Sequence, residues 1–84
     1  MKNKWEIIHE SDTDSGKPTS WALEINHERY GKYVWITGLL DDDEETIIRY
    51  DIEACYGNAG NDFRTLAQCK SLASAKRWVT MNLL

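Results

Sequence analysis

Five consecutive carboxylates, from Asp41 to Glu45, form the densest cluster of chemically active side chains in this 84-residue chain. Neighbouring negative charges repel one another, so such a run is stable only in solvent or against cations. Carboxylates along a turn and a strand can imitate phosphates and occupy a basic groove, to which long-range attraction would steer them. The alternative is a solvated hairpin tip that keeps a sheet soluble and protects its edge.

The docking hypothesis extends beyond this run. Asp51 and Glu53 follow it and would lengthen the patch, while Asp12 and Asp14 add a second acidic loop. The sequence predicts no catalytic residue. The candidate partner-binding residues are Asp41, Asp42, Asp43, Glu44, Glu45, Asp51 and Glu53.

Metal binding is the other chemistry that these residue types suit. A calcium-binding EF-hand loop starting at Asp41 would need a glycine at its sixth position and a glutamate at its twelfth, where the chain has Thr46 and Ile52. Structural zinc sites place two ligands a few residues apart, whereas the candidate zinc ligands here are separated by at least 14 residues. We therefore expect no metal and no cofactor. Those candidate zinc ligands are His9, His27, Cys55 and Cys69.

Catalytic motifs are absent from the sequence. There is no GxSxG turn and no glycine loop that could cradle a phosphate. A cysteine–histidine pair can be imagined in any small protein with two of each, so it carries no information. The two cysteines are expected to be reduced thiols. An enzyme is the least expected class.

Aromatic residues on a strand provide an alternative function. Tyr33 and Trp35 would share one face of a strand, and Val34 and Ile36 the other. If the aliphatic pair faces a helix, the exposed aromatics with Lys32 and Arg49 could stack single-stranded bases. The simpler alternative is that these rings only cover the sheet, and the nearby acidic turn would repel a phosphate backbone. Direct nucleic-acid binding through this face and a basic terminal segment is therefore the second hypothesis.

Hydrophobic alternation predicts four or five strands. Residues 11–20, 38–45 and 53–62 are rich in turn formers and are predicted as turns or loops. Phe63–Cys69 fits a strand or a helix, and we prefer a strand because a junction to a helix then follows it. The clearer strand patterns are Trp5–His9, Trp21–Asn26, Lys32–Thr37 and Thr46–Ile52. In the second of these, Leu23 would face away from Glu24, and in the last, Ile48, Tyr50 and Ile52 would share one face.

A terminal helix follows the strands. Ser71 is a good N-cap residue, because its hydroxyl can accept a hydrogen bond from a free amide of the first turn. The helix would cover one face of an antiparallel sheet. The expected fold is α+β, one domain over residues 1–84, with the helix packed on one face. Its apolar stripe is predicted as Leu72, Ala75, Val79, Asn82 and Leu83.

Charge is divided unevenly along the chain. All 14 acidic residues lie within residues 1–62, while residues 63–84 contain four basic residues and no acidic one. The net charge of −4 argues against a general nucleic-acid coat or a membrane-surface protein. No apolar run is long enough to span a bilayer or to act as a signal peptide, so we expect a cytoplasmic location.

Two segments carry a resemblance. The Gly-Lys-Tyr-Val-Trp-Ile strand of residues 31–36 and the segment from Thr65 to Val79 resemble small uncharacterised proteins of bacterial prophages and mobile elements. Short acidic proteins of that kind are similar in character to anti-CRISPR proteins, many of which are inhibitors that bind a nuclease complex. The resemblance carries over no functional residue.

The resemblance implies a non-enzymatic inhibitor or modulator of a host nucleic-acid-handling protein, acting through an acidic surface in a bacterial cytoplasm. The expected partner is a basic surface of a host protein, with a CRISPR nuclease complex as one candidate. A homodimeric module that pairs exposed strand edges is the third hypothesis.

Overall fold

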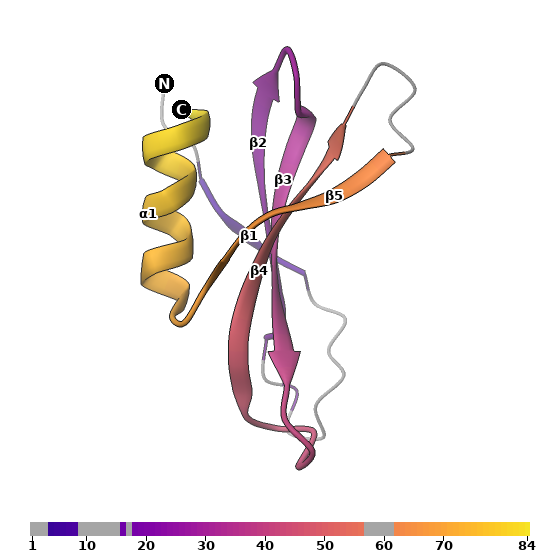
Figure 1. Ribbon diagram of the computed structural model, residues 1–84, viewed down its shortest axis with the longest axis vertical. Coiled ribbons are helices and arrows are strands. Elements are labelled where there is room, and N and C mark those ends of the chain that lie inside the picture. Colours follow the sequence, from indigo (N-terminus) through magenta and orange to yellow (C-terminus); the bar gives the residue numbers. More distant parts are fainter. Residues whose placement is uncertain (1–3, 9–15, 17, 57–61) are drawn as a thin grey trace.

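A computed structural model of the chain describes residues 4–8, 16, 18–56 and 62–84. The described strands form one antiparallel sheet in the order β1-β2-β3-β4-β5, and a single helix lies against it (Figure 1). This confirms the predicted α+β fold with a terminal helix on the sheet. The elements are β1 (Glu6–Ile7), β2 (Ser20–His27), β3 (Gly31–Leu40), β4 (Ile47–Tyr56), β5 (Asp62–Cys69) and α1 (Leu72–Leu83).

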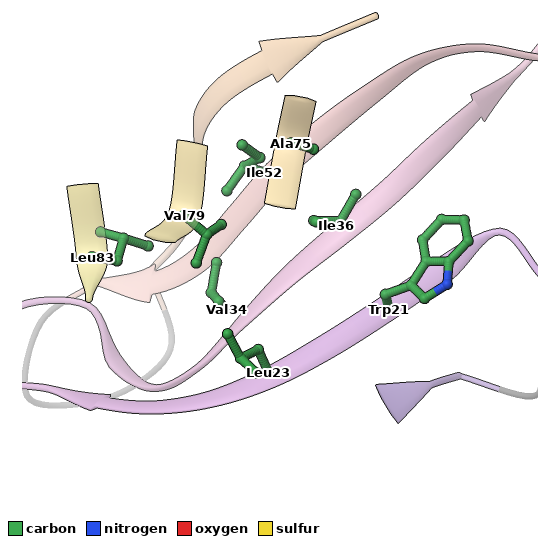
Figure 2. Close-up of a cluster of buried hydrophobic side chains, with 8 residues drawn as sticks. All are labelled: Trp21, Leu23, Val34, Ile36, Ile52, Ala75, Val79 and Leu83. Carbon is green, nitrogen blue, oxygen red and sulfur yellow. The ribbon is translucent and has the colours of Figure 1, made fainter. Parts of the chain in front are cut away.

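The hydrophobic core lies between α1 and one face of the sheet (Figure 2). Register places apolar side chains side by side on this face, because Leu23 pairs with Val34 and Ile36 pairs with Ile52. Burial of each large aliphatic side chain contributes about 1.5–3 kcal/mol. The helix contributes three buried residues to this core. They are Ala75, Val79 and Leu83.

The start of α1 follows the sequence prediction. Ser71 has extended backbone angles, and its Oγ accepts a hydrogen bond of 3.1 Å from the backbone N–H of Ser74. This bond satisfies one of the free amides of the first turn. The predicted stripe is wrong at one position, because Asn82 is exposed and donates from Nδ2 to the backbone oxygen of Trp78 at 2.8 Å. Leu83 is the buried residue there.

Two strands are longer than their residue types predicted. Residues 53–56, predicted as loop, belong to β4, where Glu53 pairs with Thr65 and Ala54 with Arg64 of β5. Residues 38–40, predicted as turn, belong to β3. Ladder hydrogen bonds to a neighbouring strand override local preferences in both places. The predicted strand at Phe63–Cys69 is confirmed within β5, while residues 57–61 of the predicted loop lie outside the described part of the chain.

A bulge in β4 corrects the predicted alternation. Leu39 pairs with Arg49 and Leu40 pairs with Ile47, so Ile48 is an extra residue without a partner on β3. Ile48, predicted to face the same way as Tyr50 and Ile52, is 51% exposed. A bulge shifts the side-chain period by one residue, and Ile47 packs against the core instead.

Candidate functional site

The β3–β4 turn carries the five consecutive carboxylates and projects beyond the helix (Figure 1). The turn is closed by backbone hydrogen bonds, from the N–H of Asp41 to the oxygen of Thr46 at 2.8 Å and from the N–H of Glu44 to the oxygen of Asp41 at 2.9 Å. Glu44 has a φ of 59°, in the left-handed region. We call Asp41–Glu45 the tip carboxylates.

Hydrogen bonds divide the tip carboxylates into two kinds. Asp43 accepts through Oδ1 from the backbone N–H groups of Glu45 and Thr46, at 2.9 and 2.8 Å, and through Oδ2 from the hydroxyl of Thr46 at 2.6 Å. The Oδ1 atom of Asp41 accepts from the N–H of Asp42 at 2.8 Å. Asp41 to Asp43 and Glu44 are all exposed, but the carboxylates of Asp41 and Asp43 stabilise the turn through these bonds, whereas those of Asp42 and Glu44 accept none within the described turn.

The other two predicted site residues lie farther along β4, on the sheet face opposite the helix. This surface is called the open face. Asp51 pairs with Thr37, and Glu53 pairs with Trp35. The side chain of Asp51 is 21% exposed and forms an ion pair of 2.9 Å with Nε of Arg49. The seven predicted residues thus lie at two places on one β-ribbon, and the charge of Asp51 is compensated.

The open face also carries an aromatic pair. Val34 and Ile36 are buried beneath the helix, so Tyr33 and Trp35 stand on the other side of the sheet, as expected. Their ring centroids lie 5.9 Å apart with an interplanar angle of 42°. The Nζ atom of Lys32 lies 5.6 Å from the centroid of the Tyr33 ring.

Glu24 on β2 is a neighbour of this pair that the sequence-based site did not include. It is exposed and lies directly across from Tyr33. Its alternation with buried Leu23 indicated a solvent-facing position, but only the register between β2 and β3 places it beside the ring. Asn26 donates to Oε2 of Glu24 at 3.1 Å. Carboxylates from β2 and β4 therefore flank the aromatic pair on β3.

The two parts of the predicted nucleic-acid site lie on different layers. The aromatic pair is on the open face, whereas Lys76 and Arg77 belong to α1 on the other side of the sheet. Two acidic residues, Glu24 and Glu53, face the aromatic pair across the strands. This arrangement does not join the aromatic pair and the basic residues of α1 into one surface.

Metal-ligand residue types do not gather in the part of the chain that the structure describes, where no group of three or more His, Cys, Asp or Glu residues could hold an ion. The Nδ1 atom of His27 accepts from the backbone N–H groups of Arg29 and Tyr30, at 3.0 and 3.3 Å, and so stabilises the β2–β3 turn. Cys55 and Cys69 are free thiols. His9, Asp12 and Asp14 lie outside the described residues.

Comparison with protein-family models, with curated proteins and with solved structures found no match to the chain. Among the described residues, no helix has the length and apolar character needed to cross a membrane. The arrangement of carboxylates and rings is therefore the basis for a functional proposal.

Proposed function

We propose that this protein is a non-enzymatic binding protein that uses acidic side chains to dock onto a basic surface of a host nucleic-acid-handling protein, and thereby inhibits or modulates it. The observation that carries the proposal is the placement of carboxylates at both the tip and the open face of the β3–β4 ribbon. The hydrophobic core lies on the opposite side of this ribbon, so docking through it would leave the fold intact.

Electrostatics supports this assignment. Exposed carboxylates at the end of a projecting ribbon create a negative potential that attracts a basic groove from a distance and orients the encounter. Asp42 and Glu44 are the tip residues best suited to this role, because they are solvent-exposed and their carboxylates do not stabilise the turn in the described structure. Glu53 would extend the contact along the strand.

The partner class follows from the resemblance to small prophage proteins of the anti-CRISPR kind. A nuclease that handles nucleic acid has a basic groove for phosphates, and a ribbon of carboxylates would compete for that groove. A CRISPR nuclease complex is therefore the first partner to test.

The test measures binding of the purified protein to a purified CRISPR nuclease complex by biolayer interferometry at several salt concentrations. We expect affinity to fall at least about tenfold between about 50 and about 300 mM KCl, since screening weakens exposed charge attraction. At low salt, the double variant Asp42→Asn/Glu44→Gln should bind more weakly than the unmodified protein, mainly because it associates more slowly.

Glu28→Gln provides the control. Glu28 is exposed in the β2–β3 turn, at the other end of β3 from the tip (Figure 1). Its replacement also removes a negative charge but should change affinity much less than a tip substitution. Binding that is insensitive to salt, or that survives the double variant unchanged, would overturn the docking mechanism.

A further inference from the structure

The aromatic pair and its flanking carboxylates form one cluster on the open face. Tyr33 is 38% exposed, and its ring lies 5.9 Å from that of Trp35. Glu24 is directly across from Tyr33 on β2, and Glu53 is directly across from Trp35 on β4. Directly opposed residues have Cβ atoms about 4.5–5.5 Å apart. A ligand group that contacts one of these rings therefore also lies within reach of the carboxylate opposite that ring.

We propose that this cluster recognises an arginine side chain of the partner protein. The inference rests on the proposed function, because it specifies the chemistry of the same docking surface. A guanidinium group is planar, so it can stack on an aromatic ring while donating two hydrogen bonds to a carboxylate. A lysine ammonium is a compact and strongly hydrated charge that lacks this planar geometry. Rings beside carboxylates therefore favour arginine over lysine.

Two contacts within the chain show the same chemistry in use. The Nζ atom of Lys32 lies 5.6 Å from the centroid of the Tyr33 ring, so this ring already attracts a cation. On the same face, Nε of Arg49 donates to Oδ1 of Asp51 at 2.9 Å. Glu53 is the next residue of β4 on this face. It makes no ion pair with the residues that the structure describes, and it supplies the carboxylate for an incoming guanidinium.

Lys32 distinguishes an arginine site from a nucleic-acid site. A lysine beside the ring competes with an incoming cation and repels it, whereas it would attract a phosphate. Replacement of Lys32 by glutamine should therefore strengthen the binding of arginine and weaken the binding of a nucleic acid.

The experiment titrates the isotope-labelled protein with nona-arginine, nona-lysine and a ten-residue oligothymidylate, at about 50 mM KCl, and follows the indole N–H resonance of Trp35 by NMR. We expect nona-arginine to bind about fivefold more tightly than nona-lysine, since an exposed cation–π contact contributes on that scale, and to shift the Trp35 resonance. Glu53→Gln and Trp35→Leu should abolish the preference, and Lys32→Gln should increase the affinity for nona-arginine.

Glu28→Gln is the matched control, because it removes one exposed negative charge outside the cluster and should weaken both peptides alike. Glu53→Gln keeps the test decisive if Trp35→Leu perturbs the fold. Equal affinity for the two peptides, a preference that persists in Glu53→Gln, or a Trp35 shift produced only by the oligothymidylate would overturn the arginine site while leaving acidic docking intact. Failure of both peptides to bind would overturn both proposals.

Discussion

Asp42 and Asp43 are adjacent and chemically identical, yet they have different roles in the β3–β4 turn. The carboxylate of Asp43 accepts three hydrogen bonds from Glu45 and Thr46. Asp42 contributes its backbone N–H to Asp41, and its own carboxylate is exposed. The run of acidic residues therefore combines a structural requirement of the turn with surface charge. Composition alone could not separate these roles, because they depend on turn geometry.

Substitution of each aspartate by alanine should separate the two roles. We expect Asp43→Ala to lower the free energy of unfolding by about 1–2 kcal/mol, because it leaves two amides of the turn without their acceptor. Asp42→Ala should change it by less than about 0.5 kcal/mol. Urea denaturation followed by tryptophan fluorescence measures both values. Asp43→Asn is the control, since it retains the Oδ1 acceptor, and equal effects of the two alanine variants would contradict this assignment.

The β3–β4 hairpin is the element on which the candidate site depends, and its bulge determines how the strands pack. With Ile48 excluded from the ladder, Ile47 turns toward the core and covers Gly38. A Cβ atom added at Gly38 would lie 2.9 Å from both Cδ1 and Cγ2 of Ile47. Glycine at this position therefore allows the side chain of Ile47 to cover the end of the core that lies next to the β3–β4 turn.

A double-mutant cycle tests this packing. Gly38→Ala should lower the free energy of unfolding by about 1–3 kcal/mol, the usual cost of overpacking. In the background of Ile47→Ala, which removes the clashing atoms, the same substitution should cost at least about 1 kcal/mol less. Thermal and urea denaturation of the four proteins measures the coupling. Additive effects of the two substitutions would show that Gly38 and Ile47 do not interact in this way.

The alternation of apolar and polar residues predicted the strands well where one face of the strand is buried. The alternation of Leu23 with Glu24 and of Val34 with Tyr33 identified β2 and β3 and the faces of their side chains. It failed at Ile48, where a bulge shifts the period, and at residues 53–56, whose strand conformation is supported by pairing with β5. Both failures have one cause, since pairing with a distant segment is absent from a local pattern.

At the scale of the whole molecule, register determines which charges meet. The sequence predicted one patch from the tip to Glu53, but the strand separates Asp51 and Glu53 from the tip, and Arg49 compensates Asp51. Glu24 joins Glu53 around the aromatic pair because β2 and β4 both adjoin β3. Of the basic residues in the terminal segment, Lys76 and Arg77 lie on α1, on the other side of the sheet from the aromatic pair. Predicting such a cluster requires the strand order and register, which hydrophobic alternation does not contain.

Repulsion among the tip carboxylates should make the stability of the whole molecule depend on salt. Asp42 and Glu44 lie within a run of five negative charges, and the described tip residues include no basic side chain among them. Screening by salt shortens the range of this repulsion to about 3 Å at 1 M. We therefore expect the free energy of unfolding to rise by about 0.5–1 kcal/mol from low to high KCl. This rise corresponds to the screening of a few like-charge contacts, each of which costs about 0.2–0.5 kcal/mol.

Thermal denaturation followed by circular dichroism, from about 20 to about 500 mM KCl, measures this dependence. The double variant Asp42→Asn/Glu44→Gln should lose most of it, because the two substitutions interrupt the run without removing the acceptors on Asp43. Glu28→Gln should retain it, since Glu28 lies at the opposite end of β3. Equal salt dependence in the double variant and in the unmodified protein would mean that the tip is too well solvated for its charges to repel one another. In that case the tip would also attract a basic partner only weakly, because the same screening acts on both interactions.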